Sequence, residues 1–229
     1  MIKHTKVSEE EDYITKETLE LKARSWYEEV KEYVRKGFSL EPTSSVLLVI
    51  DMQRFFADEQ SHAFLPAARA IVPNIKRLIA VYRACAQPVI FTRHALLDSE
   101  DPGIMGEWWA DVLREKSPMS DILPALSPLP SDTVIRKTRY NAFWGTELGD
   151  ILAQMGVKSV VITGVMTHLC CETTAREAFI RDFEVYFVVD GTATQDEEFH
   201  VSSIRNLAHG FAIPVTTSMI MDAFEGMRN

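Results

Sequence analysis

The sequence predicts an α/β protein with a three-layer, doubly wound sheet of about six mainly parallel strands and an N-terminal helical arm. Two observations predict this class. After Pro42, short apolar runs alternate with segments of helical length. Three of these runs are almost continuously apolar, as strands covered on both faces are. The predicted strands are residues 46–50, 89–92, 133–136, 160–163, 185–189 and 213–216.

Helices are predicted between the strands because apolar residues recur there at a spacing of about 3.6 residues. They cover residues 71–82, 148–155, 175–179 and 199–208. Asp196 is the expected N-cap of the last helix and Gly210 the expected residue after its end. Its histidines, His200 and His209, are expected on the surface. Residues 96–131 contain five prolines, so we expect them to form an insertion that shapes substrate access.

Residues 1–44 are predicted to form the arm and residues 45–229 the main domain. Between Thr15 and Lys36 there is no Pro or Gly, and Trp26 and Val30 recur at helical spacing with Tyr33 and Val34. This pattern predicts one amphipathic helix that ends at Gly37. We expect it to pack on the main domain or on a partner subunit; a lid over the site is the alternative.

Composition excludes several classes of protein. The chain has 229 residues, of which 46% are hydrophobic and 25% charged, and its net charge is −9. This balance argues against disorder and gives no positive field that would attract nucleic acid or an anionic membrane surface. The N-terminal sequence does not resemble a secretory signal, and no apolar run reaches the ~18 residues of a spanning helix. Three cysteines, two of them adjacent, do not form a disulfide framework, so we expect a reducing, cytoplasmic location.

Three chemically complementary residues follow three different predicted strands. Asp51 follows the run VLLVI, Lys137 follows TVIR, and Cys170 follows VVIT after a short loop. The carboxyl ends of parallel strands meet at one edge of the sheet, where ligands bind. Taken singly, such residues are usually a turn former, a surface charge and a small packing residue. Together they form a nucleophilic set, because an ammonium group lowers the pKa of a thiol and a carboxylate can accept its proton.

Three sequence blocks resemble the isochorismatase-like superfamily of cysteine hydrolases, which includes nicotinamidases and N-carbamoylsarcosine amidases. The blocks are VIDMQRFF, KTRYNAFWGTEL and GVMTHLCCETTAREA, within a match from about residue 45 to residue 224. The resemblance implies that Asp51, Lys137 and Cys170 are catalytic. It also implies a cis peptide between Val165 and Met166, and an oxyanion hole made by the N–H groups of Met166 and Cys170.

The same resemblance argues against a bound metal. Nicotinamidases of this superfamily hold a divalent metal with an Asp-x-His pair and a further His, whereas this chain reads Thr92-Arg93-His94. Stable metal sites generally need three or more protein ligands. We therefore predict no metal and no cofactor, which also argues against nicotinamidase activity.

The predicted activity is metal-independent hydrolysis of a C–N bond in a small amide, carbamoyl or ureido compound through a thioester on Cys170. True isochorismatases replace this cysteine by Gly, so Cys170 favours acyl transfer. The helical arm and the K-x-R-Y-x-A-F block are nevertheless similar to isochorismatases, so vinyl-ether hydrolysis that uses Asp51 stays an alternative. The third alternative is that the protein is a non-catalytic assembly partner.

The remaining assignments concern the pocket and the assembly. Cys85 and Cys171 are expected to be packing residues. Because relatives form oligomers, we expect a homo-oligomer, either a dimer or a tetramer, acting on a small-molecule substrate. The residues expected to contact that substrate are Phe56, Trp108, Tyr140 and His168.

Overall fold

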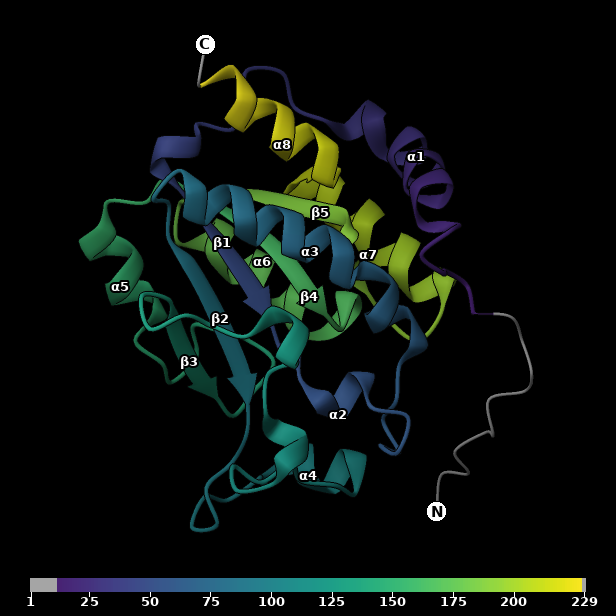
Figure 1. Cartoon of the computed structure of the whole chain (residues 1–229), viewed down its shortest axis with the longest axis vertical. Helices are drawn as coiled ribbons and strands as arrows, with labels where there is room; N and C mark the ends of the chain where they lie inside the picture. Colours follow the sequence, from purple (N-terminus) through teal and green to yellow (C-terminus); the bar gives the residue numbers. More distant parts are fainter. Residues whose placement is uncertain (1–11, 228–229) are drawn as a thin grey trace.

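Six parallel strands form one sheet in the order β3-β2-β1-β4-β5-β6, and the computed structural model describes residues 12–227 of the chain (Figure 1). The strand order reverses direction at β1, so the predicted doubly wound sheet is confirmed. The strands are β1 (Ser45–Ile50), β2 (Val89–His94), β3 (Thr133–Lys137), β4 (Ser159–Val165), β5 (Glu184–Ala193) and β6 (Ile213–Val215).

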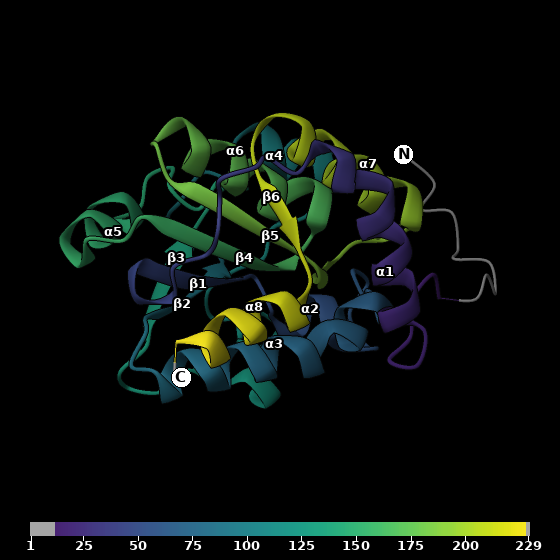
Figure 2. The same cartoon turned by 90° about the horizontal axis from the view of Figure 1, so that it is seen from above.

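Helices cover both faces of the sheet, as Figure 2 shows from above. They are α1 (Leu19–Val30), α2 (Arg54–Ala57), α3 (Pro66–Ala84), α4 (Ile104–Trp109), α5 (Leu148–Met155), α6 (Glu172–Ile180), α7 (Glu197–Gly210) and α8 (Thr217–Gly226). Helices α3 and α8 lie on one face, and α5, α6 and α7 lie on the other. This layering explains the sequence pattern: every residue of β1 and of β4 is buried, because helices cover both sides of these central strands.

The parallel sheet brings the carboxyl ends of its strands to one edge, where α2 and α4 also lie (Figure 1). The inserted stretch is fixed there by the end of β2. The Arg93 guanidinium donates to the backbone oxygens of Ser120 (2.9 Å) and Glu115 (2.6 Å). Arg136 of β3 forms an ion pair with Glu100 at 2.7 Å. The insertion is therefore held against the edge at which the catalytic residues are expected.

The arm is helical but shorter than predicted. Its helix α1 begins at Leu19, not near Thr15, and a short 3₁₀ turn (Lys31–Tyr33) follows it. Two threonines form a capping box before α1: the Thr15 N–H donates to the Thr18 hydroxyl (2.9 Å), and the Thr18 N–H donates to the Thr15 hydroxyl (3.3 Å). The Leu19 N–H donates to the backbone oxygen of Thr15 (3.0 Å), so residues 15–18 form the turn that leads into α1. Residues 1–11 of the predicted arm lie outside the described residues.

The arm packs on the main domain and not over Asp51, Lys137 and Cys170, which are called the triad below. Trp26 and Val30 are fully buried; α1 lies beside α7 in both views (Figures 1 and 2) and contacts the edge strand β6. The expectation that His200 of α7 lies on the surface is wrong, because its side chain is completely buried beneath this arm. Within residues 12–227, no helix combines the length and apolar character needed to cross a bilayer.

Candidate active site

The structure brings Asp51, Lys137 and Cys170 together at the carboxyl edge of the sheet. Asp51 directly follows β1, Lys137 is the last residue of β3, and Cys170 lies in a π-helical turn, η5 (Thr167–Cys171), between β4 and α6. Asp51 and Lys137 are almost fully buried, and Cys170 is 7% exposed. Three residues far apart in sequence therefore form one enclosed cluster.

Lys137 is the centre of this cluster. Its Nζ lies 2.6 Å from Oδ2 of Asp51, 3.3 Å from Sγ of Cys170 and 2.9 Å from the backbone oxygen of Arg139. An ammonium group has three protons to donate, so these three acceptors satisfy it completely. A buried ammonium group needs such pairing, because an unpaired buried charge is costly.

The carboxylate of Asp51 is oriented by Thr92 of the neighbouring strand. The Thr92 hydroxyl donates to Oδ1 of Asp51 (2.7 Å) and accepts from the Asp51 N–H (3.1 Å). Asp51 has a φ of +47°, a left-handed conformation that Asp tolerates better than most residues. Gly164 of β4 allows the close approach, since a Cβ at that position would lie 2.0 Å from the backbone oxygen of Ile50.

The electrostatics of the cluster define its resting state. Burial raises the pKa of the Cys170 thiol to about 12; the Lys137 charge opposes this rise and the Asp51 charge adds to it. Burial lowers the pKa of Lys137, but the charges of Asp51 and Cys170 outweigh it and hold this pKa above its usual value. At neutral pH the cluster therefore holds an ammonium group and a neutral thiol, with the Asp51 carboxyl group next to both.

The turn that carries Cys170 begins at a cis peptide bond between Val165 and Met166. The backbone oxygen of Met166 accepts from the N–H groups of Leu169 (3.1 Å) and Cys171 (3.2 Å). Cys171 is fully buried, and burial raises the pKa of its thiol well above the usual range. Its environment is that of a packing residue, as expected from the sequence. The three cysteines form no disulfide.

The residues next to Asp51 do not fit a metal ion. Thr92 occupies the position of the expected carboxylate ligand and uses its hydroxyl to orient Asp51. Burial lowers the pKa of His94 to about 4, and the Lys137 charge contributes to this shift. Within residues 12–227, no three His, Cys, Asp or Glu side chains are grouped as metal ligands. The absence of a resident metal stays a prediction.

The four residues predicted to contact the substrate lie in different surroundings. Phe56 packs edge-on against Phe55, and Trp108 is 71% exposed on α4. The Tyr140 hydroxyl accepts from Nε1 of Trp109 at 2.6 Å.

His168, the fourth, contacts α7. Its ring stacks on Phe199, with centroids 4.5 Å apart, and Nδ1 lies 2.7 Å from the Thr194 hydroxyl. Tyr140 thus connects the segment after Lys137 to the insertion, whereas His168 contacts α7 through Phe199 and the end of β5 through Thr194. For all four, a role in substrate binding stays a prediction.

Sequence reasoning missed two residues that shape the site. The sequence marks Thr92 only as the end of a predicted strand and as the residue that replaces a metal-binding Asp. Gln53, two residues after Asp51, is fully buried; its amide nitrogen donates to the backbone oxygens of His94 (3.0 Å) and Ser120 (2.7 Å), and its Oε1 accepts from the His94 N–H (2.8 Å). A polar residue in an apolar stretch, next to a residue predicted to be catalytic, is the sequence signal for such a role.

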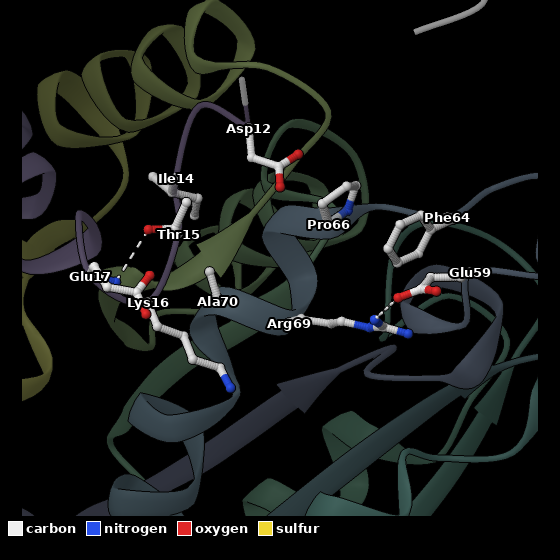
Figure 3. A pocket seen from close by; sticks show the side chains of 10 residues that line it. All are labelled: Asp12, Ile14, Thr15, Lys16, Glu17, Glu59, Phe64, Pro66, Arg69 and Ala70. Atoms are coloured by element: carbon white, nitrogen blue, oxygen red, sulfur yellow. Dashed lines mark hydrogen bonds and ion pairs between the residues drawn. The ribbon is translucent and has the colours of Figure 1, made fainter. Parts of the chain in front are cut away.

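A surface cavity of about 370 Å³ lies elsewhere, between the start of the arm and the start of α3 (Figure 3). Ile14 and Lys16 of the arm line it together with Phe64 and an ion pair between Glu59 and Arg69. Asp51, Lys137 and Cys170 do not line this cavity, so it is distinct from the cluster that they form.

Fold and site together define a class of protein: an enzyme whose buried carboxylate, ammonium group and thiol meet at the carboxyl edge of a doubly wound sheet. Residues 45–219 match the family described as Isochorismatase domain, and the chain belongs to this family. Nicotinamidase 3 of Arabidopsis thaliana is 42% identical over 177 residues, which cover 75% of this chain and 85% of that protein.

More distant relatives agree. Enterobactin synthase component B of Escherichia coli (strain K12) is 29% identical over 187 residues, which cover 81% of this chain and 65% of that protein. A solved structure described as a cysteine hydrolase from Pseudomonas syringae pv. phaseolicola 1448A matches with a TM-score of 0.80 at 26% identity, over 84% of this chain and 97% of that one. This chain is therefore a hydrolase of the isochorismatase-like superfamily.

Proposed function

We propose that this protein hydrolyses a C–N bond of a small amide, carbamoyl or ureido compound through a thioester on Cys170, without a metal. One observation carries the proposal: Nζ of Lys137 lies between Oδ2 of Asp51 (2.6 Å) and Sγ of Cys170 (3.3 Å) in a cluster that is almost completely buried. The similarity to Nicotinamidase 3 supports the cleavage of an amide bond.

In the first half-reaction, Sγ of Cys170 attacks the substrate carbonyl carbon while its proton passes to Asp51. The positive charge of Lys137 stabilises the developing thiolate and keeps Asp51 in place. The negative oxygen of the tetrahedral intermediate is bound by the N–H groups of Met166 and Cys170. Loss of one such donor typically costs ~3 kcal/mol of transition-state stabilisation.

The intermediate then collapses and the C–N bond breaks. Asp51 returns its proton to the departing nitrogen, so ammonia or an amine leaves and an acyl group remains on Cys170. In the second half-reaction, Asp51 accepts a proton from water, which attacks the thioester carbonyl. The acid is released and the thiol of Cys170 regains its proton, so the cycle closes without a redox step.

The test is ammonia or amine release from purified protein across a panel of small amides, carbamoyl compounds and ureido compounds. Nicotinamide belongs in the panel because of the relative named above. We expect turnover of at least one C–N substrate, and loss of that turnover in the Cys170→Ala variant. No turnover of any C–N substrate, together with hydrolysis of a vinyl ether, would contradict the proposal.

Vinyl-ether hydrolysis is the second candidate, favoured by the match to Enterobactin synthase component B and to a Bacillus subtilis protein named Isochorismatase, each 29% identical. The chain covers 65% and 59% of these two proteins. In this reaction Asp51 would act as the acid and the thiol would be dispensable. The Cys170→Ala variant discriminates the two, because it would retain vinyl-ether hydrolysis and lose amide hydrolysis.

We also propose that the protein self-associates as a dimer or tetramer in the cytoplasm. Support comes from the exposed apolar side chains on and near α4, since Ile104 is 72% and Trp108 71% exposed. Light scattering coupled to size exclusion measures the mass directly. A mass of 26.0 kDa at micromolar concentration would contradict self-association.

A further inference from the structure

A buried threonine begins the turn that carries Cys170. Thr167 is the first residue of η5 and is completely buried. Its hydroxyl oxygen lies 2.9 Å from Nδ1 of His200, which belongs to α7. His200 is also completely buried. The turn of the proposed nucleophile is therefore tied by a side-chain hydrogen bond to a different element of the fold.

The protonation of Nε2, the other ring nitrogen of His200, shows which atom donates in the bond between Thr167 and Nδ1. Nε2 of His200 lies 3.1 Å from the backbone oxygen of Val189, and a carbonyl oxygen can only accept. Nε2 therefore carries a proton. Burial lowers the pKa of His200 to about 4, so the ring is neutral at physiological pH and Nδ1 is an acceptor. The Thr167 hydroxyl must donate to it, which fixes the position of this hydroxyl relative to β5.

The N-terminal arm holds the imidazole in place. The ring of Trp26 packs on His200 with centroids 4.4 Å apart, and Tyr13 lies on the same ring at 6.0 Å. Trp26 is itself anchored to α7, because its Nε1 donates to Glu197 at 2.8 Å. Lys22 of the same helix forms an ion pair with Glu197 at 2.6 Å. The arm thus covers His200 and fastens α7, from which His200 projects.

A second pair of hydrogen bonds connects the arm to the turn that carries Cys170. The Tyr13 hydroxyl accepts from the Thr194 N–H at 3.0 Å, and the Thr194 hydroxyl lies 2.7 Å from Nδ1 of His168. His168 follows Thr167 in the same turn. Two successive residues just before Cys170 are therefore linked to the arm, one through His200 and the other through Thr194.

We propose that His200 is a positioning residue that fixes the turn carrying Cys170, and that the arm, through Tyr13 and Trp26, holds His200 in place. His200 acts through Thr167 and not on the reacting atoms. The arm is then neither a lid nor only an assembly surface; it is part of the support of the active site. The inference concerns what positions the sulfur atom, so it holds for any substrate that Cys170 attacks.

The test measures the reactivity of Cys170 without a substrate. Iodoacetamide labelling is followed over time, and mass spectrometry of peptides reports the label on Cys170 alone. We expect Thr167→Val to change the labelling rate of Cys170 about fivefold, the effect of one lost hydrogen bond. Thr167→Ser, which keeps the hydroxyl group, restores most of the wild-type rate.

Thr217→Val is the matched control. Thr217 is equally buried, and its hydroxyl donates to Asp190 at 3.0 Å at the start of α8, away from η5. This variant loses a buried hydrogen bond of the same kind. We expect it to lower the melting temperature and to leave the labelling rate of Cys170 unchanged.

The arm is tested by Trp26→Ala, with Trp26→Phe as the conservative variant and Leu21→Ala as the control on the exposed face of α1, where Leu21 is 75% exposed. We expect Trp26→Ala to reproduce the effect of Thr167→Val on labelling and to lower kcat with KM unchanged. Leu21→Ala should label at the wild-type rate. Trp26→Phe keeps an aromatic ring on His200 but loses the bond to Glu197, so its labelling rate should lie between those of the wild type and Trp26→Ala. If Trp26→Ala does not fold, the labelling rate of Cys170 in Thr167→Val alone tests the proposed role of His200.

The inference is overturned if Thr167→Val labels at the wild-type rate, or if it departs from that rate no more than Thr217→Val does. Because labelling needs no substrate, this outcome is distinct from failure of the proposed amide hydrolysis. A protein without any amidase activity could still show the predicted labelling pattern.

Discussion

The Nζ atom of Lys137 lies 2.6 Å from Oδ2 of Asp51, and neither side chain is exposed to solvent. A buried ion pair of this kind contributes little net stability, but removal of one partner leaves the other charge unpaired at a cost of ~3–5 kcal/mol. The pair is therefore costly to break and chemically useful, because each charge lies next to the Cys170 thiol. Its variants should change stability and activity together.

Asp51→Asn should abolish hydrolysis, with a loss of at least ~100-fold in kcat, because the amide cannot accept the thiol proton. The melting temperature should also fall, since Lys137 loses its counter-charge. Steady-state kinetics and calorimetry measure the two effects. Asp190→Asn is the control, because Asp190 is a nearly buried carboxyl group bonded to Thr217 outside the site. The Asp190→Asn variant should lose stability and keep its kcat. Equal kcat losses in Asp51→Asn and Asp190→Asn would contradict a catalytic role for Asp51.

Thr92→Val tests the orientation of the carboxylate. Removal of the hydroxyl deletes the bond to Oδ1 of Asp51 and the acceptor for the Asp51 N–H. We expect kcat to fall about tenfold, because these bonds together contribute ~1–2 kcal/mol to the correct placement of the base. Thr92→Ser should recover most of the activity. A wild-type kcat in Thr92→Val would show that Lys137 alone is enough to hold Asp51.

His200 contributes to the pH dependence of stability, as His94 does, because burial lowers both pKa values. The pKa of His200 is lowered from 6.5 to about 4 in the folded protein. Between these values the unfolded chain binds a proton that the folded chain does not, so stability falls as the pH falls from 6.5 to 4, by ~3 kcal/mol in total. His200→Gln keeps a donor and an acceptor but does not titrate. Unfolding in urea at pH 7.5 and pH 5 should show a smaller loss for this variant; equal losses would contradict the shifted pKa.

Metal independence is tested by chelation. The position of the expected carboxylate ligand is Thr92, whose hydroxyl is already used by Asp51. Protein dialysed against EDTA should keep its full hydrolytic rate, and added Zn²⁺ or Mn²⁺ should not raise it. Metal analysis of the dialysed sample is the control. Loss of activity on dialysis, with recovery on adding metal, would contradict this prediction.

The sequence was sufficient to predict the sheet and the triad because both depend on local signals. Central strands have uninterrupted apolar runs, and the strand ends of a parallel sheet meet at one edge. Strand β5 extends to Ala193, four residues beyond its predicted end at residue 189. Its last part includes Asp190 and Thr192, which are buried polar residues. An apolar run therefore does not predict where such a strand ends, because polar residues can continue the strand when other parts of the fold supply their hydrogen-bond partners.

The remaining features depend on contacts between distant segments. Thr92 and Asp51 are 41 residues apart and meet only because β2 lies next to β1. His200 lies on a helix whose sequence suggests a solvent-facing position, yet Trp26 of the arm covers it. Helical periodicity describes one helix at a time and contains no information about which other segment packs on it.

The most direct measurement is mass spectrometry of the acid-quenched enzyme during turnover of an amide substrate, with the Cys170→Ala and Cys171→Ala variants beside the wild type. We predict an acyl group on the peptide region that contains Cys170 in the wild type and in Cys171→Ala, and neither adduct nor turnover in Cys170→Ala. Wild-type turnover of the same amide by Cys170→Ala would contradict the account.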